Sequence, residues 1–190
     1  NQLYFMSNRP GGMGSADIWV SDKVDGEWTE PRNLGAPINS AYADHCLYFT
    51  GPDWSVAYWT STRPGGYGGN DIWRSERVDG VWQEAVNLGP QVNSAGSEHH
   101  SLPSADGRSL YITATRDEGY GRDDIYVTTR DESGAWGPLV NLGPLVNTEQ
   151  HDRCPAFSPD FQIFYFDSER DGGYGNKDLW WVYAENIAGA

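Results

Sequence analysis

The sequence is poor in basic residues, and this shortage limits what the protein can bind. Thirteen Lys and Arg residues stand against 27 Asp and Glu, which gives the 190-residue chain a formal net charge of −14. A surface of this sign repels phosphate backbones and anionic lipid headgroups. We therefore expect no nucleic-acid partner, and we expect cations, basic proteins or neutral glycans to suit this surface better.

Long apolar runs, helical periodicity and cysteines are also scarce. No stretch approaches the ~18 apolar residues of a membrane-spanning helix, so no membrane insertion is expected. No window shows a sustained 3.6-residue apolar period, which predicts almost no helix. The chain has only two cysteines, Cys46 and Cys154, and two cysteines do not identify a redox compartment.

Aromatic residues and glycine are abundant, and they recur in a repeat. Nine Trp, 11 Tyr and 23 Gly favour short strands joined by tight turns. One three-residue segment of the type Asp-Ile-Trp returns every 53 or 54 residues, beginning at Asp17, Asp71, Asp124 and Asp178. An arginine stands eight residues before the aspartate of each copy; these are Arg9, Arg63, Arg116 and Arg170. The repeat predicts an architecture built from similar units.

Each unit is predicted to contain four strands. In the second unit, residues 56–61, 71–75 and 82–87 alternate as strands do, and a glycine-rich loop joins the first two. Asp79-Gly80 is a strong hairpin signal between the last two. Residues 99–102 begin the first strand of the following unit. Four antiparallel strands in a repeat of this length are typical of a propeller blade, so the predicted fold class is an all-β propeller.

The repeat boundaries predict a single propeller domain made of residues 1–43, 44–97, 98–151 and 152–190. The first unit lacks its first strand and the last unit lacks its fourth, so fourteen strands are expected. We expect that an N-terminal portion of the natural protein is missing from this sequence. Unpaired blade edges would then be exposed and could pair in a dimer.

Three motifs, all present in the first unit, carry a resemblance to a known repeat. They are Leu-Tyr-Phe, then Ser-x-Arg-Pro-Gly-Gly-x-Gly-x-x-Asp-Ile-Trp, then Trp-x-x-Pro-x-Asn-Leu-Gly. Together they resemble the Tol-type (TolB-like, WD-repeat-like) bacterial β-propeller repeat. The family's first strand, Glu-x-x-Pro-x-Phe-Ser-Pro-Asp-Gly, is matched by residues 152–160. Residues 98–107 diverge more, with Ser101 in place of the first Pro, and residues 44–54 depart most.

The resemblance covers the whole chain and implies a fold and a setting, not an activity. It implies a periplasmic or extracellular protein of the bacterial envelope or secreted fraction, often an interaction module. Related propellers also occur in lyases and peptidases, where the chemistry lies in added residues or in a second domain.

The first strand of each unit carries the candidate ligand site. All four histidines and both cysteines of the chain lie at or beside the start of this strand, and inner strands converge on a propeller's channel. Carboxylate, imidazole and thiolate groups suit Zn²⁺ or a similar divalent metal. The candidate ligand or metal residues are Asp44, His45, Glu98, His99, His100, His151 and Asp152.

A structural role for the same residues is also open. The acidic residue recurs in each unit and can hold neighbouring backbone or an arginine. Strand alternation is expected to send Asp44 and Cys46 to one side and His45 to the other, so that they could not share one ion. No CxxC or HExxH spacing is present. No cofactor is therefore expected, with a divalent metal as the alternative. The cysteines lie two units apart and are expected to be free thiols.

The glycine-rich loops offer a second kind of surface. Their aspartates, from Asp17 to Asp178, are expected to accept hydrogen bonds from the loop backbone, and the repeated arginines to pair with carboxylates. Tyr67, Tyr120 and Tyr174 stand at loop tips and are candidates for contact with a protein or glycan.

No assembled catalytic motif is present, so no catalytic residue is assigned. The leading hypothesis is a non-enzymatic binding or scaffold module that uses its loop face and channel mouth. A metal-dependent polysaccharide lyase or hydrolase with a channel-mouth site is the alternative, and a lectin-like glycan binder is a third hypothesis. Asp44, Glu98 and Asp152 could supply a glycosidase pair, but their recurrence suits a scaffold better.

Overall fold

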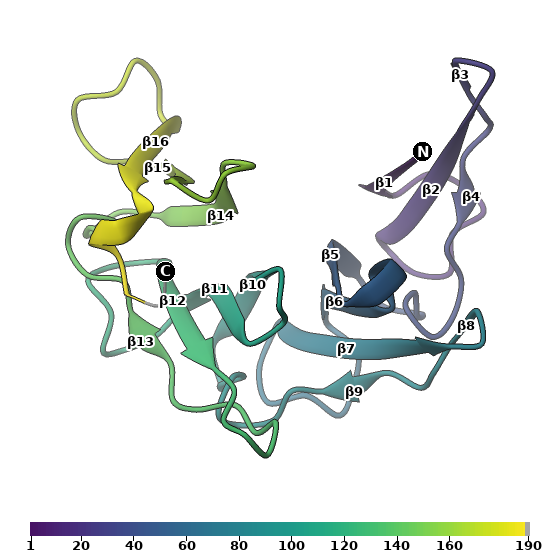
Figure 1. Cartoon of the computed structure of the whole chain (residues 1–190), viewed down its shortest axis with the longest axis horizontal. Coiled ribbons are helices and arrows are strands. Elements are labelled where there is room, and N and C mark those ends of the chain that lie inside the picture. Colours follow the sequence, from purple (N-terminus) through teal and green to yellow (C-terminus); the bar gives the residue numbers. More distant parts are fainter. Residues whose placement is uncertain (189–190) are drawn as a thin grey trace.

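Each sequence repeat folds into one small antiparallel sheet. The computed structural model describes residues 1–188, and the four sheets follow one another in an arc whose ends are the first and last sheets (Figure 1). The structure is 46 % strand and 3 % helix, with the four sheets arranged as the blades of a four-bladed β-propeller. The predicted all-β propeller fold is therefore confirmed. No helix among residues 1–188 is long and apolar enough to cross a membrane.

The strands of each sheet run in chain order from the inside of the arc to the outside (Figure 1). The first sheet contains β1 (Gln2–Ser7), β2 (Asp17–Val24), β3 (Glu27–Trp28) and β4 (Arg32–Asn33). The second contains β5 (Asp44–Thr50), β6 (Val56–Ser61), β7 (Asp71–Val78), β8 (Val81–Trp82) and β9 (Val86–Asn87). The third contains β10 (Ser97–Pro103), β11 (Ser109–Thr115), β12 (Asp124–Thr129) and β13 (Val140–Asn141), and the fourth β14 (Asp152–Phe157), β15 (Ile163–Ser168) and β16 (Asp178–Tyr183). Two short 3-10 helices, η1 (Pro52–Trp54) and η2 (Ala184–Asn186), complete the elements.

The outer strand of a blade differs from the prediction. Residues 82–87 were expected to form one strand, but they form two short pieces, β8 and β9, which pair with different parts of β7. Between the pieces, the Ser75 hydroxyl donates to the Gln83 carbonyl (2.6 Å), so a side chain replaces a bond of the backbone ladder. The first sheet is divided in the same way, so residues 1–188 contain sixteen strands in place of the fourteen expected.

Apolar cores lie between neighbouring sheets and hold the blades together. Trp59 and Tyr58 lie on adjacent positions of β6 and therefore face opposite sides of the sheet. Trp59 packs in the core shared with Ile18 of the first sheet, and Tyr58 packs in the core shared with Leu110 of the third. Both side chains are fully buried. Large aromatic residues therefore fill the space between twisted sheets, as the composition indicated.

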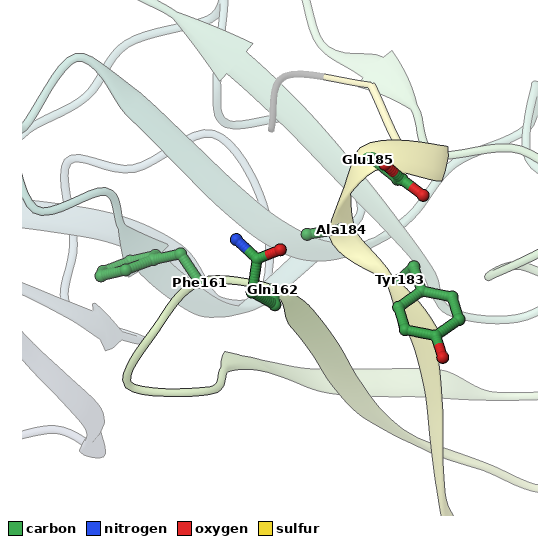
Figure 2. A pocket seen from close by; sticks show the side chains of 5 residues that line it. All are labelled: Phe161, Gln162, Tyr183, Ala184 and Glu185. Atoms are coloured by element: carbon green, nitrogen blue, oxygen red, sulfur yellow. The ribbon is translucent and has the colours of Figure 1, made fainter.

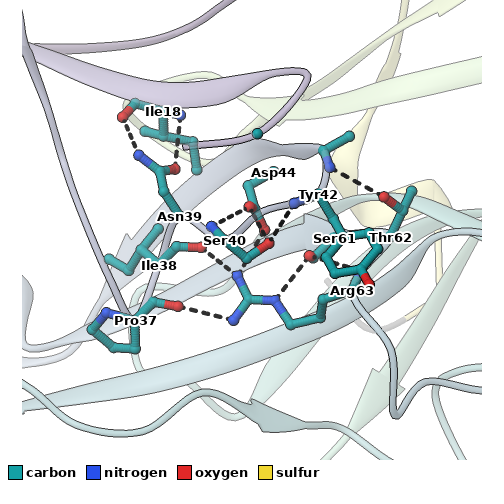
Figure 3. Close-up of polar contacts among 12 residues, drawn as sticks. Ile18, Pro37, Ile38, Asn39, Ser40, Tyr42, Asp44, Ser61, Thr62 and Arg63 are labelled. Atoms are coloured by element: carbon teal, nitrogen blue, oxygen red, sulfur yellow. Dashed lines mark hydrogen bonds and ion pairs between the residues drawn. The ribbon is translucent and has the colours of Figure 1, made fainter. Parts of the chain in front are cut away.

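A buried asparagine in the connection between blades replaces a missing strand neighbour. The Asn39 side chain accepts a hydrogen bond from the Ile18 amide (2.9 Å) and donates to the Ile18 carbonyl (2.8 Å), as Figure 3 shows. Asn93 bonds Ile72 in the same way. Asn147 completes the set with Ile125. Each blade is thus tied to the next by a side chain that acts as a short piece of β-ladder.

Candidate functional site

The repeated acidic residue at the start of each inner strand is part of the scaffold. Asp44 is fully buried, and one carboxylate oxygen lies 2.7 Å from Arg63 Nη2. Its other oxygen accepts bonds from the amide and hydroxyl of Ser40 (2.7 Å each), while Arg63 also donates to the carbonyls of Pro37 and Ile38 (Figure 3). The same pairing joins Glu98 to Arg116 (3.2 Å) and Asp152 to Arg170 (2.8 Å).

These contacts decide what the three acidic candidates can do. Asp44, Glu98 and Asp152 are all fully buried, and each neutralises an arginine and fixes the connection to the preceding blade. Their oxygens are therefore engaged in the blade and do not face a ligand. Within residues 1–188, no group of three or more His, Cys, Asp or Glu side chains is arranged to hold a metal ion. The geometry thus adds no support to the predicted metal site.

The residues that follow the acidic position lie in a β-bulge. In β5, β10 and β14 one extra residue is inserted against the neighbouring strand, directly after His45, Glu98 and Arg153 respectively. Cys46 and Cys154 take positive φ angles of 54° in these bulges, an uncommon conformation for residues other than glycine. Bulges of this kind re-aim side chains and are over-represented beside functional sites.

The bulge corrects one expectation from the sequence. Simple strand alternation places His45 and Cys46 on opposite sides, but His45 Nδ1 lies 3.3 Å from Cys46 Sγ. The expectation was wrong because alternation holds only where the pleat is unbroken. His45 Nε2 also lies 3.3 Å from Oδ1 of Asn70, on the loop that precedes β7.

Polar side chains of the third and fourth blades converge on a buried carboxylate, that of Asp123. Arg153 Nε donates to Asp123 Oδ2 (2.5 Å), and His151 Nδ1 lies 2.8 Å from the same oxygen. The Thr115 hydroxyl donates to Asp123 Oδ1, and His99 Nε2 lies 3.8 Å from that oxygen. Burial alone would raise the pKa of Asp123, but the bond from Thr115 and the charge of Arg153 outweigh it, so its pKa lies below the usual value.

Side chains two residues after the repeated acidic position link the third and fourth blades directly. Cys154 Sγ in β14 lies 3.3 Å from His100 Nε2 in β10. The other ring nitrogen of His100 is buried and has no hydrogen-bond partner among the described residues. Both cysteines are free thiols, and burial raises the pKa of Cys46 to about 11. The thiols are therefore protonated at neutral pH and are poor nucleophiles.

Three histidines at the starts of the inner strands are held in their uncharged form. Burial is the main cause that lowers the pKa of His45, His99 and His100. The effect is largest for His100, whose pKa falls to about 4; its neighbour His99 lowers it further, while Asp167 opposes the shift. At neutral pH the inner strands therefore present uncharged imidazoles beside one tightly paired arginine and aspartate.

Four residues that make these contacts are not among the candidate ligand residues of the sequence analysis: Asn70, Thr115, Asp123 and Arg153. Asn70 and Asp123 precede the repeated aspartate of their loops, where the other two repeats carry Ala16 and Lys177. The sequence feature that could have identified Asn70 and Asp123 is this position, which carries a different residue in each repeat although the aspartate that follows it never changes. We call His45, Cys46, His99, His100, Asp123, His151, Arg153 and Cys154 the channel-facing cluster.

The glycine-rich loops hold the other predicted residues. Asp17 accepts bonds from the amides of Met13 and Gly14, and Asp71 from that of Tyr67 (2.9 Å). Asp124 and Asp178 accept equivalent bonds from their own loops. Arg9 has no carboxylate partner among the described residues and instead lies over the rings of Phe5 and Trp19. At the loop tips, the side chains of Tyr67, Tyr120 and Tyr174 are exposed.

Comparison with known proteins supports the fold and nothing finer. No protein-family model matches the sequence, and no curated protein matches it. An α-L-arabinofuranosidase from Lactobacillus brevis superposes with a TM-score of 0.58 at 11 % identity, over 96 % of this chain and 68 % of the other. A prolyl endopeptidase superposes with a TM-score of 0.53 at 11 % identity, over 97 % of this chain and 24 % of the other.

A third solved structure is a periplasmic gluconolactonase from Pseudomonas aeruginosa, with a TM-score of 0.47 and 17 % identity over 88 % of this chain. This chain spans 47 % of the gluconolactonase and 24 % of the prolyl endopeptidase. At 11 % identity, the likeness to the arabinofuranosidase and the prolyl endopeptidase shows the fold alone, because one fold supports many functions.

Proposed function

We propose that this chain is a non-enzymatic binding module that holds a polar, uncharged ligand at its channel-facing cluster. The observation that carries the proposal is a contrast between neighbouring positions. Scaffold residues such as Asp44 and Asp152 repeat with the same partners in successive blades. The adjacent positions, His45, His99 and Arg153, differ in chemistry and in their partners: His45 lies beside Asn70, whereas His99 and Arg153, which come from two different blades, both lie beside Asp123.

A repeat scaffold needs no such asymmetry. Identical side chains at these positions would build identical blades, as the buried asparagines and arginines do. Different residues that nevertheless converge are expected where one ligand contacts several blades in different ways. Uncharged imidazoles can both donate and accept hydrogen bonds, which suits a ligand rich in polar groups but without net charge.

The carboxylates count against the hydrolase alternative. A glycosidase needs two carboxyl groups that flank its substrate. Asp44, Glu98 and Asp152 are fully buried in arginine pairs, and Asp123 is held by Arg153. The remaining expectations, an envelope or secreted setting and a Tol-type repeat, form part of the proposal and follow from the motifs of the sequence.

The proposal is tested by exchanging residues between equivalent positions of the repeats. His100→Cys places at the third blade the residue that the second and fourth blades already carry there, so the fold should tolerate it. Purified wild-type and variant protein would be screened by thermal shift against neutral oligosaccharides and unmodified peptides, with Trp28→Ala on β3 as a remote control.

We expect at least one probe to raise the Tm of the wild type and of the Trp28→Ala control, and to lose that effect in His100→Cys. The assignment of the site is refuted if no probe loses its effect in His100→Cys. Turnover of a probe, seen as new reducing ends or cleaved peptide, would favour an enzyme. Stoichiometric metal in protein purified without chelators would favour the metal-dependent alternative.

A further inference from the structure

The opposite ends of the same inner strands carry an aromatic groove that the channel-facing cluster does not use. A hollow of about 440 Å³ lies where β5, β10 and β14 end and their turns begin. Its apolar lining comes from three blades: Phe49, Trp54, Leu102, Pro103, Phe157 and Phe161. Ligand sites in proteins are commonly hollows of this size with aromatic walls. We call this hollow the turn-face groove.

Two of its aromatic residues occupy a backbone position that favours glycine. The turn after the inner strand is repeated in three blades, and in the third blade its left-handed residue is Gly107 (φ 68°). The equivalent residues are Trp54 (φ 56°) in the second blade and Phe161 (φ 58°) in the fourth. Bulky residues rarely adopt this conformation, and such strain gathers at ligand clamps.

Both residues are also exposed, so packing in a core does not explain their presence. Trp54 is 62 % exposed and Phe161 is 50 % exposed. Each ring is supported from behind by another ring of the groove: Trp54 lies 5.7 Å from Phe49, and Phe161 lies 5.6 Å from Phe157, between centroids. The rings are therefore held in place while one face of each stays open.

The groove continues on the far side of Phe161. A second hollow of about 410 Å³ is lined by Phe161, Gln162, Tyr183, Ala184 and Glu185 (Figure 2). Figure 2 shows Phe161 on one side of this hollow and Tyr183 on the other, with Gln162 between them. Because Phe161 lines both hollows, the two lie side by side and form an extended path suited to a chain-like ligand.

The hydroxyl groups of the groove determine what kind of chain fits. Thr50 donates its proton to the Ser104 carbonyl (3.1 Å), Ser104 to Asp106 (2.6 Å) and Ser158 to Asp160 (2.6 Å). Each hydroxyl has one proton and two lone pairs, so these three groups can only accept further hydrogen bonds. These hydroxyls therefore suit a ligand that brings hydrogen-bond donors.

A saccharide fits these hydroxyl groups better than a proline-rich peptide does. An extended proline-rich chain offers carbonyl acceptors that need donors from the protein. A sugar carries hydroxyl donors around a ring whose C–H faces stack on aromatic rings. The residues that line the turn-face groove carry no charge, and the net charge of −14 disfavours polyanions. We propose that the turn-face groove binds a neutral oligosaccharide, with Trp54 and Phe161 as stacking platforms.

The test uses the residue that the third blade already has. Trp54→Gly and Phe161→Gly remove the rings and place glycine where the backbone favours it, so the fold should persist. Binding of cellohexaose, xylohexaose and chitohexaose would be measured by calorimetry, and folding would be checked by circular dichroism and Tm. Trp28→Gly, which removes an exposed ring far from the groove, is the matched control, and a proline-rich decapeptide and a hexagalacturonate are the competing probes.

We expect at least one neutral hexasaccharide to bind the wild type and Trp28→Gly equally, and to bind each groove variant at least tenfold more weakly at unchanged Tm. Binding should also survive His100→Cys, which separates this groove from the channel-facing cluster. The proposal is overturned if none of the three sugars binds, if the groove variants bind as the wild type does, or if the peptide or the polyanion is the tighter ligand.

Discussion

Replacing the buried asparagine that ties one blade to the next should destabilise the whole propeller. Asn93 is 1 % exposed; its Oδ1 accepts from the Ile72 amide (2.8 Å), and its Nδ2 donates to the Ile72 carbonyl (3.0 Å) and to Asn87 Oδ1 (2.8 Å). In Asn93→Ala the Ile72 amide loses its partner. The Ile72 carbonyl still accepts from the Leu88 amide, and Asn87 Oδ1 still accepts from the Gly89 amide.

The contacts give the size of the effect. A buried amide without a partner costs about 1–3 kcal/mol, and each of the two other lost hydrogen bonds costs about 0.5–1.5 kcal/mol. We therefore expect Asn93→Ala to lower the free energy of unfolding by about 2–6 kcal/mol. Asn176→Ala, at an exposed loop position, should change it by less than about 0.5 kcal/mol.

Urea unfolding followed by tryptophan fluorescence would measure both variants. Hydrogen exchange at the Ile72 amide gives an independent local reading, because that amide should become much less protected in Asn93→Ala. The reasoning fails if the free energy of unfolding stays within about 0.5 kcal/mol of the wild type, or if exchange at Ile72 is unchanged. Asn39→Ala and Asn147→Ala should behave like Asn93→Ala, since they make the same contacts.

Three further predictions concern the ionisable groups. Burial chiefly holds the pKa of His100 at about 4, so the folded protein binds this proton less readily than the unfolded chain, and stability is lost as pH falls from 6.5 towards 4. Between pH 7 and pH 4.5 the wild type should lose about 2–3 kcal/mol more than His100→Gln in urea unfolding, and equal losses would contradict this. Arg63→Ala leaves the buried Asp44 carboxylate without its counter-charge and should cost about 3–5 kcal/mol, whereas calorimetry should show a smaller loss for Arg9→Ala, which has no carboxylate partner among the described residues. Burial raises the pKa of Cys46 from 9.0 to about 11, so at pH 8 iodoacetamide should modify it roughly 100-fold more slowly than a small free thiol; a rate like that of the free thiol would show that the group is not buried as described.

The fold could be predicted from the sequence because the repeated residues are those that each blade needs for its own structure. Asp71 caps its glycine-rich loop, Asn93 completes a ladder and Trp59 fills an inter-blade core. Each of these roles depends on local sequence or on a neighbour at a constant spacing, so the aspartate and the asparagine recur, and the position of Trp59 carries an apolar residue in the other blades, namely Phe5, Ile112 or Phe166. The outer strand was less predictable, because the bond from Ser75 to Gln83 that divides it appears only once the hairpin has formed.

The candidate site could be predicted from the sequence only in part. The sequence pointed to His45, His99, His100 and His151, but it joined them to acidic residues that serve the scaffold. It also missed Asp123, whose partners His151 and Arg153 come from a different blade. Contacts between blades depend on the angle between neighbouring sheets, and the spacing of residues along the chain does not give that angle.

By itself, then, the sequence determined the repeat, the blade and the residues that stabilise it, because those contacts recur at fixed separations along the chain. The tertiary structure decided which side chains meet. The bulge at Cys46 turned His45 towards it, and the ring of blades brought Arg153 to Asp123. It also placed Trp54 and Phe161, which are 107 residues apart, along one groove. The proposed binding sites depend on these long-range contacts, which form only when the sheets pack against one another.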